Sequence, residues 1–186
     1  MGFLFCGARD FNQPIEKWDV SNVTNIDGMF YGAWSFNQPL STWNVSNVVN
    51  MCTTFERAIC FNQNIENWDT SKVYIMSNMF CKASSFNQPL GKWNVSGVRK
   101  MDSMFECATR FNQPLSKWNV SDVRSMYAMF QEAESFNQPL HTWDVSKVTN
   151  MSYMFYKAYS FNQYVDDWGI SSKVKSYCML EKSSSF

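Results

Sequence analysis

The sequence predicts an α/β fold, a right-handed solenoid with one short parallel strand and one helix in each 25-residue unit. The first observation behind this prediction is the triplet Phe-Asn-Gln, which recurs at a constant interval. Its seven copies begin at Phe11, Phe36, Phe61, Phe86, Phe111, Phe136 and Phe161. The second observation is the order of apolar residues within each unit, which favours a strand followed by a helix. Because a unit of this length cannot bury its apolar side chains alone, we expect the copies to stack along one axis.

The strand is predicted from a short alternation of apolar and polar residues. In the second unit, Trp43 and Val45 flank Asn44. Successive side chains of a strand point to opposite faces, so Trp43 and Val45 are expected to face the core. The same tryptophan position is filled in every unit, by Trp18, Trp43, Trp68, Trp93, Trp118, Trp143 and Trp168. Strands of consecutive units are expected to form a parallel sheet, with the helices on its other side as right-handed crossovers require.

The helix is predicted to follow the strand, because apolar residues then recur at helical spacing. In the second unit these residues are Val48, Met51, Phe55 and Ala58. At about 3.6 residues per turn they share one face of a helix of roughly three turns. Ser46 precedes this segment, where serine is a favoured N-cap. Methionine at helical spacing beside phenylalanine indicates an adaptable core residue.

The asparagine of Phe-Asn-Gln is present in all seven units. Buried turn backbone needs a hydrogen-bond partner in every unit. We therefore predict that these asparagines form a ladder that bonds turn backbone between units, and that they do not bind a ligand.

The chain is expected to form a single solenoid domain over residues 1–186. Residues 1–10 match the second half of a unit and are interpreted as a partial N-terminal repeat, and residues 11–160 hold six full repeats. Residues 161–186 diverge, because residues 169–174 include one extra residue and Tyr164 replaces the proline. The last residues are polar, as expected of a C-terminal repeat that caps the core.

Composition and charge argue against several functional classes. Lys plus Arg equals Asp plus Glu at 16 each, so no net field attracts nucleic acid. No apolar run is long enough for a membrane span, and the first residues lack the features of a signal peptide. One histidine, six scattered cysteines and no Gly-rich phosphate loop predict no catalytic, metal or cofactor site. The sequence therefore indicates a protein that is not an enzyme.

The phrase from Phe136 through Phe155 (Phe-Asn-Gln-Pro-Leu-x-x-Trp-Asp-Val-Ser-x-Val-Thr-Asn-Met-Ser-x-Met-Phe) resembles the BspA-like bacterial surface-protein repeat. That family is also catalogued as a lipoprotein repeat of unknown function in mycoplasmas. The resemblance covers nearly the whole chain and implies a leucine-rich-repeat-like solenoid. It also implies adhesion or protein binding, at the cell surface for the bacterial members, and no catalytic residues. We expect neither a lipoprotein signal nor a cell-wall anchor in this sequence, which would be a departure from the bacterial pattern.

Partner contacts are expected from the variable positions, because the constant ones are used by the fold. One candidate surface is the column of Asp and Asn that follows each tryptophan, with its carboxylates at Asp19, Asp69 and Asp144. Asp19 and Asp69 lie two units apart, roughly 10 Å at the usual strand spacing, which is too far to share a metal ion. The column is interpreted as a solvated acidic ridge, with a polar recognition surface as the alternative.

A second candidate surface is aromatic. Tyr127, Tyr153, Tyr156 and Tyr159 occupy variable positions of neighbouring units, and Trp34 is the one tryptophan outside its column. Tyrosine is common at interfaces because it offers a large amphipathic contact area. The alternative is that some of these tyrosines cover the end of the core. Arg99, Lys100 and Arg124, with Lys72 and Lys117 nearby, form the basic cluster of the chain, interpreted as a solvated patch or as a site for an acidic partner.

These observations predict a non-catalytic protein-interaction module or scaffold, which includes an accessory subunit of a larger assembly. The alternative is a cell-surface adhesin whose repeats bind host or matrix ligands. A protein partner is expected in both cases, with neither nucleic acid nor a membrane span.

Overall fold

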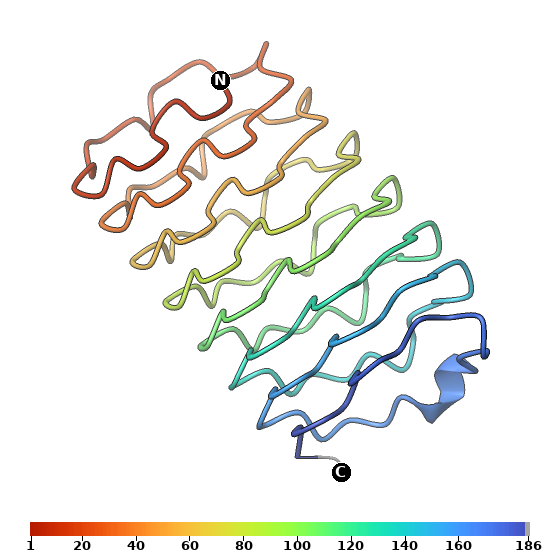
Figure 1. Ribbon diagram of the computed structural model, residues 1–186. Coiled ribbons are helices and arrows are strands. Elements are labelled where there is room, and N and C mark those ends of the chain that lie inside the picture. Colours follow the sequence, from red (N-terminus) through yellow and green to blue (C-terminus); the bar gives the residue numbers. More distant parts are fainter. Residues whose placement is uncertain (185–186) are drawn as a thin grey trace.

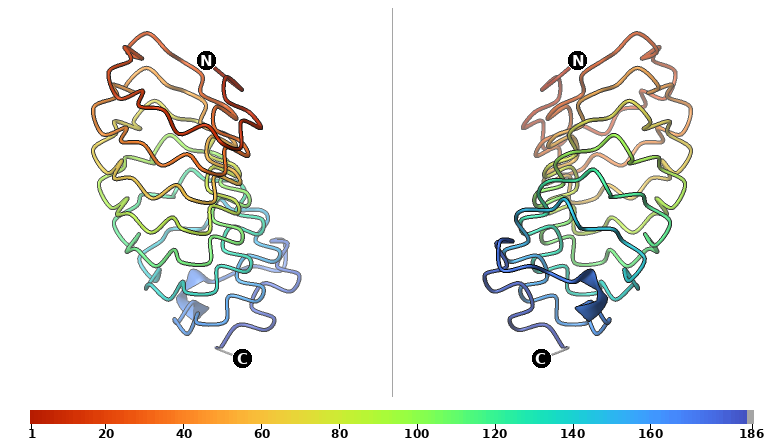
Figure 2. Two further views of the ribbon diagram at one scale, coloured as in Figure 1. Left: turned by 90° about the vertical axis from the view of Figure 1, so that its left-hand side faces the viewer. Right: turned by 90° about the vertical axis from the view of Figure 1, so that its right-hand side faces the viewer.

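The computed structural model describes residues 1–184, which form a stack of 25-residue coils. We call each coil a rung and count it from the Phe of Phe-Asn-Gln. Figure 1 shows the rungs side by side in chain order, from the red N-terminal end to the blue C-terminal end. Figure 2 shows from both sides that the bends of successive rungs follow one another along the stack. Repetition in the sequence therefore becomes repetition in space.

Adjacent rungs pair in parallel, but within residues 1–184 they do so without forming strands. One position per rung makes isolated bridges to the equivalent position of the next rung. The bridged pairs are Asn25–Asn50, Asn50–Ile75, Ile75–Lys100, Lys100–Ser125, Ser125–Asn150 and Asn150–Lys175. The predicted strand at Trp43-Asn44-Val45 is absent, and residues 1–184 contain one helix, the three-residue 3-10 helix η1 (Asp166–Trp168). The predicted α/β class, with a helix and a strand in each unit, is therefore wrong.

Consecutive tight turns occupy the segment where the helix was predicted. Met29 N–H donates to Ile26 O at 3.1 Å within its own rung, whereas Phe30 N–H donates to Thr54 O of the next rung at 2.9 Å. This alternation continues along the segment, so about half of its N–H groups bond to another rung. An α-helix would direct each N–H to the carbonyl four residues earlier. Bonds between rungs replace that pattern here.

Two positions in each rung have a left-handed backbone conformation, which interrupts any helix. In the first full rung they are Gly28 and Gly32, with φ angles of 58° and 66°. The first position is filled elsewhere by Phe3, Thr53, Asn78, Ser103, Ala128, Tyr153 and Cys178, and the second by Gly7, Arg57, Lys82, Cys107, Glu132, Lys157 and Lys182, all with positive φ. This conformation costs most L-residues roughly 1–2 kcal/mol. Bonding between rungs must offset that cost.

The predicted core residues are buried even though the predicted helix is wrong. Val48, Met51, Phe55 and Ala58 are all fully buried. In a tight turn the first and fourth residues lie close together. Consecutive turns therefore place the side chains of residues i and i+3 on the same face of the segment, much as a helix does. The role of methionine as a core residue is confirmed. The predicted N-cap at Ser46 is wrong, because no helix follows it and Ser46 N–H donates instead to Asn44 Oδ1 at 3.2 Å.

The tryptophan column forms a buried stack with its own hydrogen-bond ladder. Trp43 Nε1 donates to Ile15 O of the preceding rung at 3.1 Å, and its ring lies parallel to Trp68 at 6.5 Å. The five later tryptophans of the column repeat this bond at 2.9–3.2 Å. Trp18 is the exception, with 41% of its surface exposed. Burial of each indole therefore depends on the rung before it.

The asparagine ladder predicted from the sequence is confirmed. Asn87 Oδ1 accepts a hydrogen bond from Asn112 N–H at 2.9 Å and from Gln113 Nε2 at 3.0 Å. The backbone N–H of the asparagine in each later rung bonds in this way to the side chain one rung earlier, in the pairs Asn37–Asn12, Asn62–Asn37, Asn87–Asn62, Asn112–Asn87, Asn137–Asn112 and Asn162–Asn137, all at 2.9 Å. Asparagine suits this position because one side-chain oxygen accepts both bonds.

The last rung accommodates its extra residue without losing register. η1 is followed by Gly169, which has a left-handed conformation with φ of 54°. Lys175 N–H donates to Thr149 O at 3.0 Å, and Lys175 O accepts from Met151 N–H at 2.6 Å. In the preceding rungs these two bonds are shared between two consecutive residues: the N–H of the first donates to the rung before, and the carbonyl of the second accepts from it. Lys175 makes both and thereby absorbs the additional residue.

We expect the substitution Lys82→Gly to stabilise the protein by about 0.5–1 kcal/mol. Lys82 is exposed and has φ of 61°, whereas Gly7 and Gly32 fill the same position in the first two rungs. Relief of the left-handed conformation is worth roughly 1–2 kcal/mol. The greater freedom of glycine in the unfolded chain offsets about 0.5–1 kcal/mol of that gain. Urea denaturation of both proteins measures the difference.

Arg110→Gly is the matched control. Arg110 is also exposed but does not have a positive φ, so the same loss of side chain should destabilise the protein by about 0.5–1 kcal/mol. Equal effects of the two substitutions would contradict the argument from backbone conformation.

Candidate interaction site

Three tyrosines gather around Tyr153 near the C-terminal end of the stack, and we call the four residues together the tyrosine cluster. The ring of Tyr153 makes edge contacts with Tyr127 at 5.8 Å, Tyr156 at 5.7 Å and Tyr177 at 5.3 Å. Tyr127 and Tyr177 occupy the same position in rungs that lie on either side of Tyr153. The regular spacing of the rungs therefore builds the cluster from residues distant in the sequence.

The backbone and two lysines hold the tyrosine cluster in place. Tyr153 N–H donates to Tyr177 O at 2.8 Å. The ammonium groups of Lys157 and Lys182 lie over the ring of Tyr156, at 5.3 and 5.6 Å from its centre. Lys157 also pairs with Glu132 at 3.1 Å. The arrangement is an aromatic surface with a cationic edge.

The outer tyrosines of the cluster are accessible. Tyr127 is 40% exposed and Tyr177 is 68% exposed, while Tyr153 and Tyr156 are partly buried. Burial is the main cause that raises the pKa of Tyr153, so its hydroxyl stays neutral at physiological pH. The cluster therefore offers ring surface and the neutral hydroxyl group of Tyr153 for contact.

The structure places the predicted aromatic residues in more than one location. It brings together Tyr127, Tyr153 and Tyr156, and adds Tyr177, which the sequence prediction did not include among the binding residues. The signal for Tyr177 was available, because it lies two 25-residue intervals after Tyr127. Tyr159 is exposed, and no ring contact joins it to the cluster within residues 1–184. Trp34 lies far along the stack, in the first full rung.

The carboxylates predicted as an acidic ridge belong to turns of the backbone. Asp19, Asp69 and Asp144 each accept a hydrogen bond at 2.9–3.0 Å from the backbone N–H of the serine two residues later. Hydrogen bonds from that serine lower the pKa of each carboxyl group. These three side chains are exposed and stay ionised near neutral pH, so they also present negative charge to solvent.

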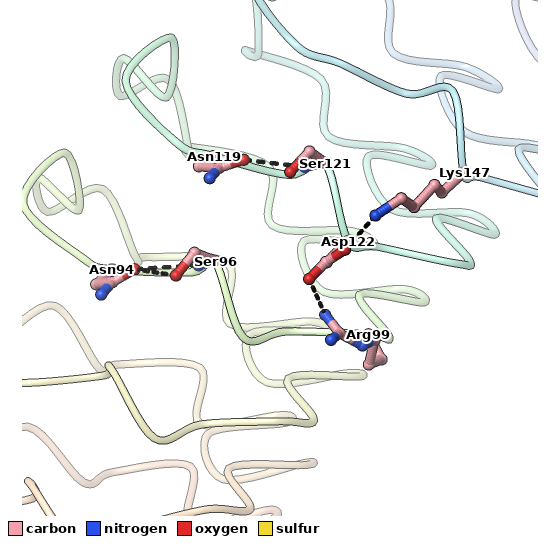
Figure 3. A network of polar contacts seen from close by, with 7 residues as sticks. All are labelled: Asn94, Ser96, Arg99, Asn119, Ser121, Asp122 and Lys147. Carbon is pink, nitrogen blue, oxygen red and sulfur yellow. Dashed lines mark hydrogen bonds and ion pairs between the residues drawn. The ribbon is translucent and has the colours of Figure 1, made fainter.

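Asparagine serves the same turn where it replaces aspartate. In Figure 3, Asn94 and Asn119 are bonded to Ser96 and Ser121, at 3.1 and 3.2 Å from the serine N–H. Both residue types supply the acceptor oxygen that such a turn needs. The alternation of Asp and Asn in this column therefore has a structural cause.

The predicted basic cluster is partly neutralised. Asp122 pairs with Arg99 of the preceding rung at 2.9 Å and with Lys147 of the next rung at 2.6 Å (Figure 3). The hydrogen bond from Lys147 is the main cause that lowers the pKa of Asp122. The guanidinium of Arg99 also lies 5.8 Å from the centre of the Tyr74 ring. The Arg99 side chain is thus used mainly within the protein.

The thiols and carboxylates do not converge on a metal site in the part of the chain that the structure describes. All six cysteines are free thiols. Burial raises the pKa of Cys52 and Cys107 to about 11, which keeps both protonated near neutral pH. Between residues 1 and 184, no helix has the length and apolar character needed to cross a membrane.

Comparison with known families identifies the repeat. The family model described as "Mycoplasma protein of unknown function, DUF285" matches residues 1–114 and, a second time, residues 88–186. This chain belongs to the DUF285 family. The two DUF285 matches together span the chain and confirm both its repeated nature and the predicted mycoplasma-type repeat family. The second match contains the whole tyrosine cluster. A search of curated proteins found no match.

Proposed function

We propose that this DUF285 protein is a non-catalytic protein-interaction module and that the tyrosine cluster is its binding surface. The observation that carries the proposal is the convergence of Tyr127, Tyr156 and Tyr177 on Tyr153 at 5.3–5.8 Å. These tyrosines stand at variable positions of the rung, while the constant positions supply the core and the ladders. The frame is thus common to all rungs, and the aromatic surface belongs to one end of the stack.

The chemistry of the cluster suits a protein partner. Tyrosine rings give contact area with few rotatable bonds, and partly buried rings lose little further freedom on binding. Lys157 and Lys182 place positive charge beside Tyr156. A partner with an apolar centre and acidic residues at its rim would complement this surface.

A second candidate function is cell-surface adhesion. The resemblance of the segment Phe136–Phe155 to BspA-like repeats supports it, because the bacterial members of that family are associated with adhesion. Tyr153, at the centre of the tyrosine cluster, lies within the same segment, and the cluster would then contact a host or matrix protein. Both candidates use the same surface and differ in the location of the partner.

Exposed tyrosines can be removed with little effect on the core, which makes the proposal testable. We expect the double variant Tyr127→Ala, Tyr177→Ala to capture its partners in a cross-linking pull-down at an amount at least tenfold lower than that captured by the intact chain. A partner that depends on two central aromatic contacts loses about 1–2 kcal/mol for each. Circular dichroism should show an unchanged thermal midpoint, because both side chains are exposed.

The matched control is the double variant Tyr74→Ala, Tyr164→Ala. Tyr74 and Tyr164 are also exposed but lie outside the tyrosine cluster. The control should keep all partners. Unchanged capture by the Tyr127 and Tyr177 variant, at unchanged stability, would rule out this surface.

A further inference from the structure

A separate hollow lies near the N-terminal half of the stack, and we call it the Trp34 groove. It has a volume of about 340 Å³ and is lined by Trp34, Arg57, Ile59, Lys82, Ser84 and Cys107. None of these residues belongs to the tyrosine cluster or to the network of Asp122. The groove therefore concerns a different part of the surface from the proposed function.

Two columns of the rung form the walls of the groove. Trp34, Ile59 and Ser84 follow one another at 25-residue intervals along one wall. Arg57 and Lys82 follow one another along the other wall. The groove thus runs along the stack, across several rungs, with apolar side chains facing a row of cations.

The apolar wall is large and exposed but firmly held. Trp34 is 40% exposed and Ile59 is 39% exposed. Trp34 O accepts a hydrogen bond from Cys60 N–H at 3.0 Å, and Ile59 O accepts one from Ser85 N–H at 3.2 Å. The backbone that carries the two side chains is therefore tied to the next rung. A ligand would meet a preformed surface, with little ordering cost on binding.

The charge of the groove is positive. Neither Arg57 nor Lys82 forms an ion pair with any residue in the range 1–184. A third cation, Arg9, lies over the ring of Trp34 at 4.2 Å. Glu56 and Glu106 are nearby acidic residues, and Cys107 Sγ of the groove donates to Glu132 Oε2 at 3.6 Å, but within residues 1–184 none of these carboxylates forms an ion pair with Arg57 or Lys82. The exposed cations of the wall are therefore available to pair with the negative charges of a ligand.

We infer that the Trp34 groove binds an extended acidic peptide segment of a partner protein. An apolar side chain of the peptide packs between Trp34 and Ile59, and carboxylates on either side of it meet Arg57 and Lys82. At roughly 4.8 Å per rung, each wall spans two intervals, about 10 Å, and the whole groove from Trp34 to Cys107 spans three, about 14 Å, which equals four or five residues of extended chain. The alternation of side chains along an extended peptide suits a groove with one apolar and one cationic wall.

The dimensions and charge favour a peptide over nucleic acid. The protein has equal numbers of acidic and basic residues, so it has no broad field for a polyanion. The cations of the groove form a short row beside apolar side chains. Binding there requires an apolar group as well as negative charge.

The inference is tested with the full chain and three blocked, fluorescent pentapeptides. The first alternates glutamate and phenylalanine, the second lysine and phenylalanine, and the third glutamate and serine. We expect saturable binding of the first peptide by fluorescence anisotropy, at least tenfold tighter than that of the other two. A short single-stranded oligonucleotide should compete at least tenfold less well than the unlabelled first peptide.

Three variants locate the binding site. Arg57→Glu and Trp34→Ala should each weaken binding of the glutamate–phenylalanine peptide at least fivefold. Lys82→Gly should weaken it at least threefold while the thermal midpoint stays the same or rises, so unfolding does not account for the loss. The control Lys117→Glu changes an exposed lysine that does not line the groove and should leave binding within twofold of the original.

Several results would overturn the inference. They are absence of saturable binding by the glutamate–phenylalanine peptide, equal binding of the lysine peptide, and effective competition by the oligonucleotide. A loss for Lys117→Glu as large as that for Arg57→Glu would indicate attraction to the general charge of the protein, and it would equally rule out the groove as the site.

Discussion

Replacement of Trp93 by alanine is expected to destabilise the protein by about 3–5 kcal/mol. Trp93 is only 3% exposed, lies parallel to Trp68 at 6.4 Å and contacts Phe80 at 6.2 Å. Its Nε1 donates to Ile65 O at 3.0 Å. Alanine would leave a cavity between two rungs and would remove one of the two hydrogen bonds that Ile65 O accepts, the other coming from Trp68 N–H at 3.1 Å. Urea denaturation followed by far-UV circular dichroism measures the loss.

Two further variants separate the contributions to this loss. Trp93→Phe keeps an aromatic ring but removes the N–H, so about 1–2 kcal/mol should be lost for the missing hydrogen bond to Ile65 O and the smaller ring. Trp18→Ala removes the indole of the same column that is 41% exposed, and roughly 1 kcal/mol should be lost. If Trp93→Ala costs less than 1 kcal/mol, or no more than Trp18→Ala, the column does not stabilise the stack as described.

The effect of Trp93→Ala should extend to neighbouring rungs. Each rung of residues 1–184 bonds to the rung before it and the rung after it, so its stability is largely a property of its two interfaces. A cavity at Trp93 weakens the interface with the rung of Trp68 first. Two separate unfolding transitions in the variant, in place of one, would be consistent with this dependence.

The sequence was sufficient to predict the repeat interval and the core but not the backbone conformation. Met51 and Phe55 are buried as predicted. Their spacing is shared by a helix and by consecutive tight turns, so periodicity alone could not separate the two. The decisive feature is the left-handed conformation at residues such as Thr53 and Arg57. These residue types rarely adopt it, and only the glycines at the first rungs gave a signal.

The candidate surfaces were predictable where the interval of 25 residues could be counted. Tyr127 and Tyr177 share a position in the rung, and that arithmetic relates the two outer tyrosines of the cluster, whereas Tyr153 and Tyr156 stand at other positions of the rung. Trp34 was named from its isolation in the sequence, but its groove was not predicted. Its opposite wall, Arg57 and Lys82, comes from a position two residues earlier in the unit, and the relation of the two walls depends on the turn between them. If the predicted helix had formed, the side chains of the two walls would have a different relative position.

The turn residues show a similar limit. Asp19 and Asp144 were predicted as an exposed ridge, and both are exposed. Their hydrogen bonds to the backbone of Ser21 and Ser146 were not predicted, because the serine was interpreted as the cap of a helix. A column that contains either Asp or Asn already indicates, in the sequence, a side-chain oxygen that accepts a hydrogen bond from backbone N–H.

Replacement of Asn87 by alanine is expected to destabilise the protein by about 1–3 kcal/mol. Asn87 Oδ1 accepts from Asn112 N–H and from Gln113 Nε2, at 2.9 and 3.0 Å. Gln113 Nε2 keeps a second acceptor, Asn87 O at 3.1 Å, so its loss is small. Asn112 N–H would lose its acceptor in a part of the turn that is partly buried. The full cost of an unpaired donor therefore falls on that amide.

Hydrogen exchange measured by NMR tests this assignment at a single residue. The amide of Asn112 should exchange at least tenfold faster in Asn87→Ala, which corresponds to about 1.4 kcal/mol of lost protection. Asn87→Asp retains the acceptor oxygen and should preserve the slow exchange of Asn112. Gln88→Ala removes a donor to Asn62 Oδ1 but leaves that oxygen bonded to Asn87 N–H at 2.9 Å, so its effect on stability should stay below about 1 kcal/mol. Removal of the acceptor should thus matter more than removal of a donor, and equal losses in Asn87→Ala and Gln88→Ala would contradict the ladder as the cause.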